Sequence, residues 1–410
     1  MSERRVVVTG MGGVCAFGET WKEISKKFKE GKNAVKFLPT LKEFEGLNTY
    51  LAAPVENFTL PETYTRKKIR SMGRVALFST RATELALREA NLIGDPVLTN
   101  GRTGIAFGSC TGSSDAVCDF ARMMTEHTTR YITATSYVRM MPHTTAVNTA
   151  IFFGIRGRVI PTSSACTSGS QAIGYAWEAI RNGYADVMVA GGAEQFCPSE
   201  VAAFDTLFAT SVKNDTPEVT PSPFDVNRDG LVIGEGGGAL ILEDLEHAKA
   251  RGAHIYAELI GFATNCDATH ITQPNAETIE ICMRDALSIA NITPSDIGYI
   301  NAHGTGTKRG DAAEGRATEA VFGSETPISS LKSYLGHTLG ACGALEAWFT
   351  IEMMNEGWFA PTINLVSPDP ACGNLAHIQG NGLTLQTDCV MTNNFAFGGV
   401  NTSLIFKRWN

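Results

Sequence analysis

The chain has 410 residues, of which 43% are hydrophobic and 19% are charged, a globular composition long enough for two domains or one duplicated domain. Its formal net charge of −8 excludes a protein that binds nucleic acid over its whole surface. No stretch reaches about 18 apolar residues and the first residues carry no signal-peptide pattern, so we expect no membrane span and a cytoplasmic location. Its ten cysteines include no CxxC pair, so we expect neither a disulfide framework nor a zinc site.

Strand and helix patterns alternate along the chain, which predicts an α/β protein with layered sheets and helices. In chain order the predicted elements are a buried strand at 5–9, a helix at 81–91, a strand at 104–107, a strand at 158–165 that runs into a helix at 166–182, and a strand at 186–190.

The second half of the chain repeats the first. Four segments match in the same order: 86–92 with 286–292, 109–112 with 303–306, 166–169 with 337–340, and 238–242 with 402–406. Because four matches in one order argue against chance, we predict a duplication, with an N-terminal half at 1–252 and a C-terminal half at 253–410.

Two glycine-rich segments imitate known motifs. The run at 10–13 follows a strand, but Cys15 occupies the third glycine position of GxGxxG, so a dinucleotide site is not expected. The segment 108–112 has the spacing of a nucleophile elbow with Cys110 in the central position, and it remains a competitor for the nucleophile. The histidines share no metal-ligand spacing on a helix face, so no metal is expected.

Cys166 is the strongest candidate nucleophile. It stands where a strand turns into a helix of small residues, and the positive end of a helix favours a thiolate. A buried, inert cysteine would be the alternative if Cys166 stood alone. The duplication, however, puts His337 at the start of the equivalent helix and His303 at the end of a strand, so we expect the three side chains to converge in one cavity.

These motifs resemble the elongating β-ketoacyl-[acyl-carrier-protein] synthases, condensing enzymes of the thiolase superfamily. The resemblance covers essentially the whole chain and rests on the segments 5–10, 165–169, 223–236, 301–305, 332–337 and 394–401. It implies a duplicated thiolase fold with five layers, α/β/α/β/α, which is usually a homodimer and needs no metal or organic cofactor.

The resemblance also implies the reaction. Cys166 takes an acyl group from a carrier thioester, and His303 and His337 hold the oxygen of a malonyl thioester while it loses CO2. The resulting carbanion attacks the acyl group and gives a β-ketoacyl thioester. Backbone N–H groups of Cys166 and Phe397 stabilise the tetrahedral oxyanion.

Further positions carry over from the same resemblance. Lys332 and Glu314 match supporting residues that order the site together, with a solvated surface pair as the alternative. Thr305 and Thr307 match the lining of the phosphopantetheine tunnel, although hydroxyls in a turn also bond to their own backbone. The remaining substrate-binding positions are Thr111, Phe204 and Phe395.

The implied partners are an acyl carrier protein and its acyl and malonyl thioesters. Because carrier proteins are acidic, the basic segment 66–70, with Arg74, is the best candidate docking patch, and a solvated helix face is the alternative. We expect a homodimer or a heterodimer with a related subunit.

Several positions depart from the family pattern. Ala396 replaces a glycine of the GFGG loop, Phe208 stands where an arginine is common, and Thr111 replaces a hydrophobic residue near the floor of the acyl pocket. A polar floor indicates an unsaturated, aromatic or oxygenated acyl group, as in polyene or polyketide synthesis. Two other functions compete: a non-catalytic chain-length subunit, which lacks the nucleophile, and a degradative thiolase, which needs a second cysteine near 393–397.

Overall fold

The structure is a computed structural model that describes residues 3–410, and its strands form two groups. The first group has the order β5-β4-β6-β8-β1 and the second the order β9-β16-β15-β10-β11-β13. The groups meet where β1 pairs with β9 at Val7 and Val8. Their bounds are β1 (Val6–Cys15), β4 (Thr103–Gly108), β5 (Val159–Thr162), β6 (Val187–Glu194), β8 (Gly236–Asp244), β9 (Ala257–Cys266), β10 (Ile297–Asn301), β11 (Pro327–Ser329), β13 (Ala376–His377), β15 (Cys389–Phe395) and β16 (Val400–Arg408).

Both groups have the same topology. Read from the junction outward, β1-β8-β6-β4-β5 corresponds to β9-β16-β15-β10-β11. The four sequence matches fall on equivalent places: on helices α3 (Arg74–Glu89) and α10 (Ala276–Ala290), after β4 and β10, at the approaches to α7 (Ser168–Arg181) and α13 (Cys342–Glu356), and in β8 and β16. The predicted duplication is therefore confirmed, whereas the division at residue 252 stays a prediction.

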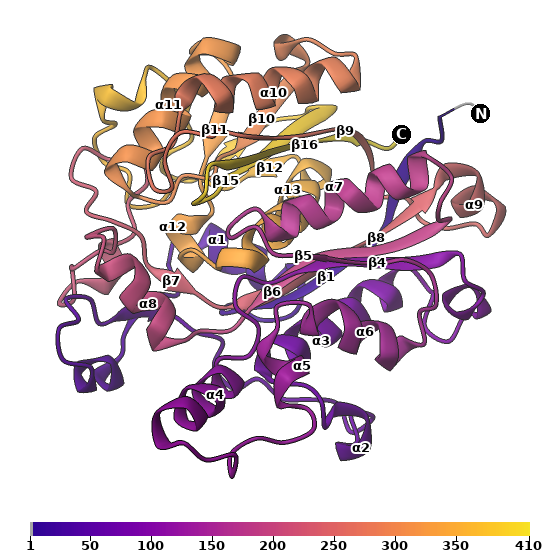
Figure 1. Ribbon diagram of the computed structural model, residues 1–410. Helices are drawn as coiled ribbons and strands as arrows, with labels where there is room; N and C mark the ends of the chain where they lie inside the picture. Colours follow the sequence, from indigo (N-terminus) through magenta and orange to yellow (C-terminus); the bar gives the residue numbers. More distant parts are fainter. Residues whose placement is uncertain (1–2) are drawn as a thin grey trace.

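The molecule has five layers, as predicted (Figure 1). Helices α7 and α13 lie between the two sheets. The outer face of the first sheet is covered by α3 and α6 (Thr144–Phe153), and the outer face of the second by α10 and α11 (Lys308–Phe322). Both central helices are rich in small and apolar residues and are buried over most of their length, while Glu178 of α7 and the last two residues of α13 are exposed.

Strand β1 is longer than the predicted segment 5–9, because the glycines at 10–13 continue it to Cys15. The reason is close packing of α3 on the strand. A Cβ atom on Gly10 would lie 2.3 Å from the carbonyl oxygen of Ala86, and one on Gly12 would lie 2.6 Å from Leu85 Cβ. These glycines therefore permit contact between helix and sheet.

The remaining elements are short and connect the layers. Two small sheets lie outside the main one, and within residues 3–410 no helix has the length and apolar character needed to cross a bilayer. The helices are α1 (Trp21–Lys29), α2 (Arg66–Ile69), α4 (Ser114–Glu126), α5 (Ser136–Met140), α8 (Pro198–Asp205), α9 (Leu245–Ala250) and α12 (Lys332–Leu335), and the strands are β2 (Lys36–Phe37), β3 (Leu51–Ala53), β7 (Ile233–Gly234), β12 (Trp358–Phe359) and β14 (Leu383–Thr384).

Candidate active site

Cys166 lies in a tight turn between β5 and α7. Ala165 adopts a left-handed conformation with φ of 53°. The Ser168 hydroxyl donates to the Ala165 carbonyl at 2.6 Å and accepts the N–H of Ser164 at 3.0 Å. These bonds fix the turn, and the Cys166 side chain is buried in it.

His337 faces Cys166 from the segment that leads into α13. Its backbone N–H donates to the carbonyl of Val232 at 2.7 Å. Its ring nitrogen Nε2 lies 2.9 Å from Cys166 Sγ, which is hydrogen-bond distance. Two segments 171 residues apart therefore present a thiol and a proton acceptor to each other.

His303 completes the group from the turn after β10. Glu314 on α11 holds this turn, because its carboxyl oxygens accept the backbone N–H groups of His303 and Gly304, both at 2.7 Å. The His303 ring stands nearly perpendicular to that of His337, with ring centroids 5.1 Å apart. One ligand atom from each histidine and Cys166 Sγ all lie within 4.8 Å of one another.

Asn394 determines which nitrogen of His303 carries the hydrogen. Its amide nitrogen Nδ2 donates to Glu346 Oε2 at 2.8 Å and lies 3.5 Å from His303 Nδ1. A donor at this distance from Nδ1 favours the tautomer with the ring hydrogen on Nε2. His303 is thus prepared to donate a hydrogen bond from Nε2.

Both histidines are neutral at physiological pH. Burial lowers the pKa of His303 and of His337 well below the ordinary value of 6.5, and the charge of Lys332 acts in the same direction. The pair therefore supplies neutral donors and acceptors.

The resting state of Cys166 differs from the sequence expectation of a thiolate. Burial raises the pKa of the thiol to about 12, although the Lys332 charge and the backbone N–H groups of Phe397 and Cys166 lower it. Cys166 precedes the first residue of α7 and is removed from water, so the helix end does not offset the cost of burying a charge. The side chain is a thiol whose proton has His337 as its acceptor.

Lys332 pairs with Glu346, while Glu314, the other supporting residue that the resemblance implies, holds the His303 turn. The ammonium of Lys332 donates to Glu346 Oε1, and both side chains are buried. The pKa of Lys332 is raised even though burial opposes its charge, because Glu346 lies beside it. Glu346 escaped the sequence analysis, yet an acid inside the apolar helix α13 is a signal for a buried partner.

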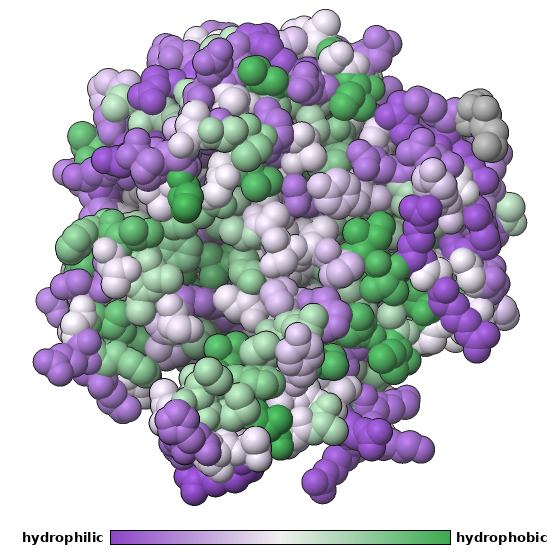
Figure 2. Space-filling view, in the orientation of Figure 1, coloured by the Kyte–Doolittle hydropathy of each residue, from purple (hydrophilic) through white to green (hydrophobic). Residues whose placement is uncertain are grey.

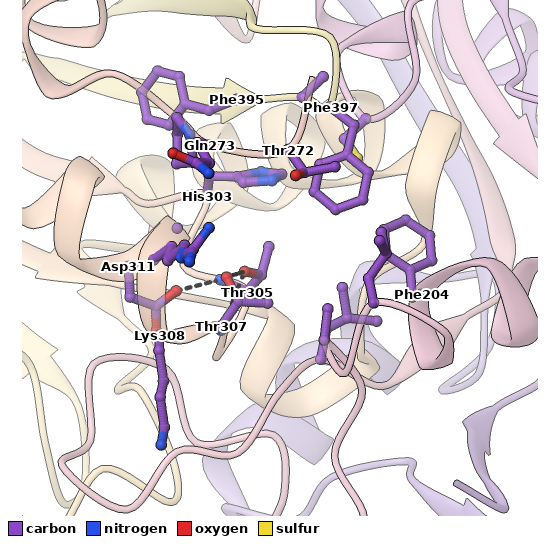
Figure 3. Close-up of a pocket in the computed structure, with 18 of the residues that line it drawn as sticks. Phe204, Thr272, Gln273, His303, Thr305, Thr307, Lys308, Asp311, Phe395 and Phe397 are labelled. Carbon is purple, nitrogen blue, oxygen red and sulfur yellow. Dashed lines mark hydrogen bonds between the residues drawn. The ribbon is translucent and has the colours of Figure 1, made fainter. Parts of the chain in front are cut away.

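A cavity of about 690 Å³ opens over these groups (Figure 3). Its lining includes most of the residues expected from the sequence, namely Cys166, Phe204, His303, Thr305, Thr307, Glu314, His337, Phe395 and Phe397. The rings of Phe204 and Phe397 pack together with centroids 5.0 Å apart.

The hydroxyls of Thr305 and Thr307 lie 2.9 Å apart on the wall of this cavity. Asp311, which the sequence analysis missed, accepts the backbone N–H groups of Thr305 and Gly306 at 3.0 and 3.1 Å. The turn is therefore supported by a buried carboxylate. The two hydroxyls bond to each other, and Thr305 Oγ1 also accepts the backbone N–H of Thr307 at 3.4 Å, so the alternative of hydroxyls that bond to their own turn holds for Thr305.

Thr111 and Cys110 do not line this cavity. The Thr111 hydroxyl donates to Glu200 Oε1 at 3.1 Å, so it is satisfied within the protein. The backbone N–H of Cys110 is held by Glu194 at 2.7 Å, and burial raises the pKa of its thiol well above the usual value. An atypical acyl chain stays a prediction, but no unpartnered Thr111 hydroxyl supports it.

The three converging side chains are poorly suited to hold a metal ion. A histidine that binds zinc normally donates its second N–H to a carboxylate or a carbonyl. Here Nδ1 of His303 faces the Asn394 donor, and Nδ1 of His337 has no hydrogen-bond partner among residues 3–410. The arrangement suits hydrogen bonds to a substrate oxygen.

Comparison with known proteins agrees with this geometry. Residues 3–248 match the family described as Beta-ketoacyl synthase, N-terminal domain, and residues 256–366 match its C-terminal domain. The chain belongs to the β-ketoacyl synthase family of condensing enzymes. The resemblance and the enzyme class drawn from the motifs are thus confirmed.

Relatives match over their full length. A 3-oxoacyl-[acyl-carrier-protein] synthase 1 of Haemophilus influenzae is 38% identical over 99% of this chain and 100% of its own. A Beta-ketoacyl synthase from Burkholderia phymatum is 55% identical with a TM-score of 0.98, covering 99% of this chain and 100% of that one. A ketosynthase solved with a type II PKS acyl-carrier protein and a hexaketide is 32% identical with a TM-score of 0.87, covering both chains fully at 100%.

The lowered pKa of both histidines predicts a loss of stability in acid. Below the unfolded value of about 6.5, the unfolded chain binds two protons that the folded chain does not bind, so the free energy of unfolding falls as pH falls. Each histidine contributes up to about 1.4 kcal/mol per pH unit. Denaturant unfolding between about pH 7 and pH 5 should show a shallower decline for His337→Asn than for the wild type, and equal slopes would contradict the assignment.

Proposed function

We propose that this enzyme transfers an acyl group from a carrier thioester to Cys166 and condenses it with a malonyl-carrier thioester. The observation that carries this function is the 2.9 Å contact between Cys166 Sγ and His337 Nε2, with the N–H of His303 beside it in the same cavity. No metal and no organic cofactor enters the reaction.

Acyl transfer comes first. Cys166 Sγ attacks the thioester carbonyl as its proton moves to His337 Nε2, which later protonates the departing carrier thiol. The backbone N–H groups of Phe397 and Cys166 lower the pKa of the Cys166 thiol, as donors close to Sγ do. They are the oxyanion donors of this step, and such donors are each worth about 3–4 kcal/mol in the transition state.

Decarboxylation follows. The oxygen of the malonyl thioester accepts the Nε2–H of His303. It also accepts the Nε2–H of His337, once water has taken the Nδ1 proton of this ring and returned one to Nε2. Loss of CO2 leaves an enolate that these two donors stabilise, and no base is needed because the carboxylate supplies the electron pair. The enolate carbon attacks the acyl carbonyl, and Cys166 leaves as a thiolate that takes up a proton from water, which is the one proton that the overall reaction consumes.

The non-catalytic chain-length subunit is the weaker function for this chain. Such a subunit needs no nucleophile, yet Cys166 is present with its proton acceptor at 2.9 Å. The degradative thiolase is weaker still, since residues 393–397 contain no cysteine.

The phosphopantetheine arm of the carrier protein enters along the cavity. Thr305 and Thr307 line this cavity, and their hydroxyls bond to amides of the arm. Most of the predicted docking cations lie in the segment 66–70, which comprises helix α2 and the residue after it, and their side chains are exposed. Arg74 is unsuitable, because its guanidinium is bonded to the buried carboxylate of Glu235 and to the carbonyl of Val55.

We also propose a homodimer in which β5 pairs with β5 of a second copy. This strand ends the first sheet, so its outer edge is unpaired, and Val159 on it is 41% exposed. The adjoining helix α6 exposes Ile151 to 77%, and Figure 2 shows hydrophobic residues gathered in that region.

The dimer is tested on the purified chain alone. Light scattering should give twice the mass of one chain, and Val159→Lys should shift it toward the monomer because a charge is then buried at the edge. A wild type that is monomeric at micromolar concentration contradicts the homodimer and favours a heterodimer with a related subunit.

Cys166→Ala should abolish the mass increase that an acyl-carrier thioester produces on the intact protein, because no other thiol lines the cavity. The matched control is Cys110→Ala, which should acylate like the wild type. Acylation of Cys166→Ala at Cys110 would instead support the nucleophile elbow at 108–112.

His303→Ala should still be acylated at Cys166 but should lose condensation by about 100-fold or more, since it lacks one donor to the enolate. His303→Asn, which keeps an N–H donor, should recover part of the rate. The measurements are acyl-enzyme formation by mass spectrometry and release of CO2 from malonyl-carrier thioester. Condensation near the wild-type rate in His303→Ala would overturn the assigned role.

A further inference from the structure

Glu200 on α8 is a buried acid with one oxygen that lacks a hydrogen-bond partner. Its side chain is only 6% exposed. Oxygen Oε1 accepts the hydroxyl of Thr111 at 3.1 Å, whereas Oε2 is buried and has no hydrogen-bond partner among residues 3–410. Burying a polar atom without a partner is costly, which makes Oε2 a candidate contact for a bound molecule.

A second buried acid, Glu194, lies beside the same hydroxyl. Its oxygen Oε1 is 3.4 Å from the hydroxyl oxygen of Thr111, so the two carboxyl groups are close neighbours. Glu194 is well supplied with donors, which are the hydroxyl of Ser109 and the backbone N–H groups of Cys110 and Gly340, at 2.8, 2.7 and 3.1 Å. These donors favour the ionised form of Glu194 and leave Glu200 as the acid that is short of partners.

Glu200 is protonated at neutral pH. Burial and the neighbouring charge of Glu194 raise the pKa of Glu200 well above the usual value of 4.5, because two carboxylates so close together do not both ionise. Since Oε1 accepts the hydrogen of Thr111, the acid hydrogen of Glu200 belongs on Oε2. Glu200 therefore offers an O–H donor to an oxygen acceptor.

The acyl group on Cys166 has to leave the cavity free for condensation. The malonyl arm occupies that cavity while the acyl group is still bound to Sγ, and it enters from the side on which the exposed Lys308 lies. Two chains cannot fill the same volume, so the acyl chain extends toward the opposite side. Figure 3 shows Phe204 and Phe397 on that side of the cavity.

This side of Cys166 leads to Glu200. Cys166 belongs to an apolar cluster that also contains Cys110 and Phe204. Thr111 directly follows Cys110 in the chain. Glu200 lies four residues before Phe204 on α8, so both side chains are on the same face of this helix. An acyl chain that extends from Sγ through the cluster therefore meets Thr111 and Glu200 at its far end.

We propose that Glu200 is a specificity-determining residue that binds an oxygen atom at the far end of the acyl group, so that the enzyme selects acyl chains with a hydroxyl or keto tip. This rests on the proposed function. Either oxygen accepts the O–H of Glu200, whereas a methyl tip leaves that donor buried and unpaired. An ammonium tip fits poorly, because it has three donors and no acceptor for a neutral acid.

A purely structural role for Glu200 leads to a different expectation. It is the third residue of α8, and an acid at this position reaches back to the N–H of the N-cap residue, here Cys197. That N–H lowers the pKa of Glu200, yet no hydrogen bond joins it to Oε2. In this role, a replacement of Glu200 would lower the melting temperature and leave the choice of acyl chain unchanged.

The experiment uses acyl-pantetheine thioesters, so that docking of a carrier protein does not enter the result. Series of acyl chains of increasing length end in a methyl, a hydroxyl or a keto group, and acylation of Cys166 is followed by mass spectrometry. At the length at which the tip reaches Glu200, the wild type should prefer an oxygenated tip over the methyl tip by about tenfold in kcat/KM, which corresponds to about 1.4 kcal/mol. The hydroxyl and keto series show which oxygen fits better.

Glu200→Leu replaces the acid with an apolar side chain of similar volume, so it should reverse the preference and favour the methyl tip. Glu200→Gln keeps an N–H donor, so it should keep most of the preference for an oxygenated tip. The matched control is Ser199→Ala, the exposed neighbour on the same turn of α8, which should choose among the tips as the wild type does.

A wild type that prefers the methyl tip at every length overturns the proposal without any variant. An unchanged preference in Glu200→Leu also overturns it, and a lower melting temperature would then assign Glu200 to the helix end. A stronger preference for an ammonium tip would show that the two acids bind a cation instead. If no thioester acylates Cys166, the proposed function itself is wrong, whereas acylation without a tip preference contradicts only the role of Glu200.

Discussion

Direct backbone contact between α7 and α13 is the constraint on which the site depends. A Cβ atom on Gly169 would lie 3.0 Å from the carbonyl oxygen of Gly340, and one on Gly343 would lie 2.6 Å from the backbone nitrogen of Ser170. Because the two central helices touch in this way, the segments that precede them converge, and Cys166 and His337 meet. Larger residues at these glycines would separate the halves and with them the thiol and its proton acceptor.

Burial between the sheets also determines the protonation states. The same exclusion of water keeps both histidines neutral and keeps Cys166 a thiol. Lys332 and Glu346 form a buried ion pair behind the site, in which each charge is balanced by the other. The Cys166 nucleophile therefore becomes charged only while its proton is transferred. The two histidines are neutral donors, so they do not form an ion pair with a substrate carboxylate.

Duplication explains how one fold supplies different groups from equivalent places. The approach to α7 provides a cysteine and the approach to α13 a histidine, while β10 and its turn provide the second histidine. Among the insertions of the first half, α8 contributes Phe204 to the wall of the cavity, and the segment after α8 contributes further lining residues. The symmetry of the core thus fixes the catalytic groups, and the asymmetric insertions shape the approach of substrates and carrier.

The sequence by itself determined the layered α/β class, the duplication and the convergence expected of Cys166, His303 and His337, because periodicity and internal repeats are local properties of the chain. The expectation of an ionised Cys166 was wrong, and the sequence did not reveal that Lys332 pairs with Glu346 or that the guanidinium of Arg74 is bonded to Glu235. Each of these depends on which side chain from a distant segment lies within hydrogen-bond distance and on how much water remains. Only the tertiary structure decides those two quantities, since long-range packing sets both neighbours and solvation.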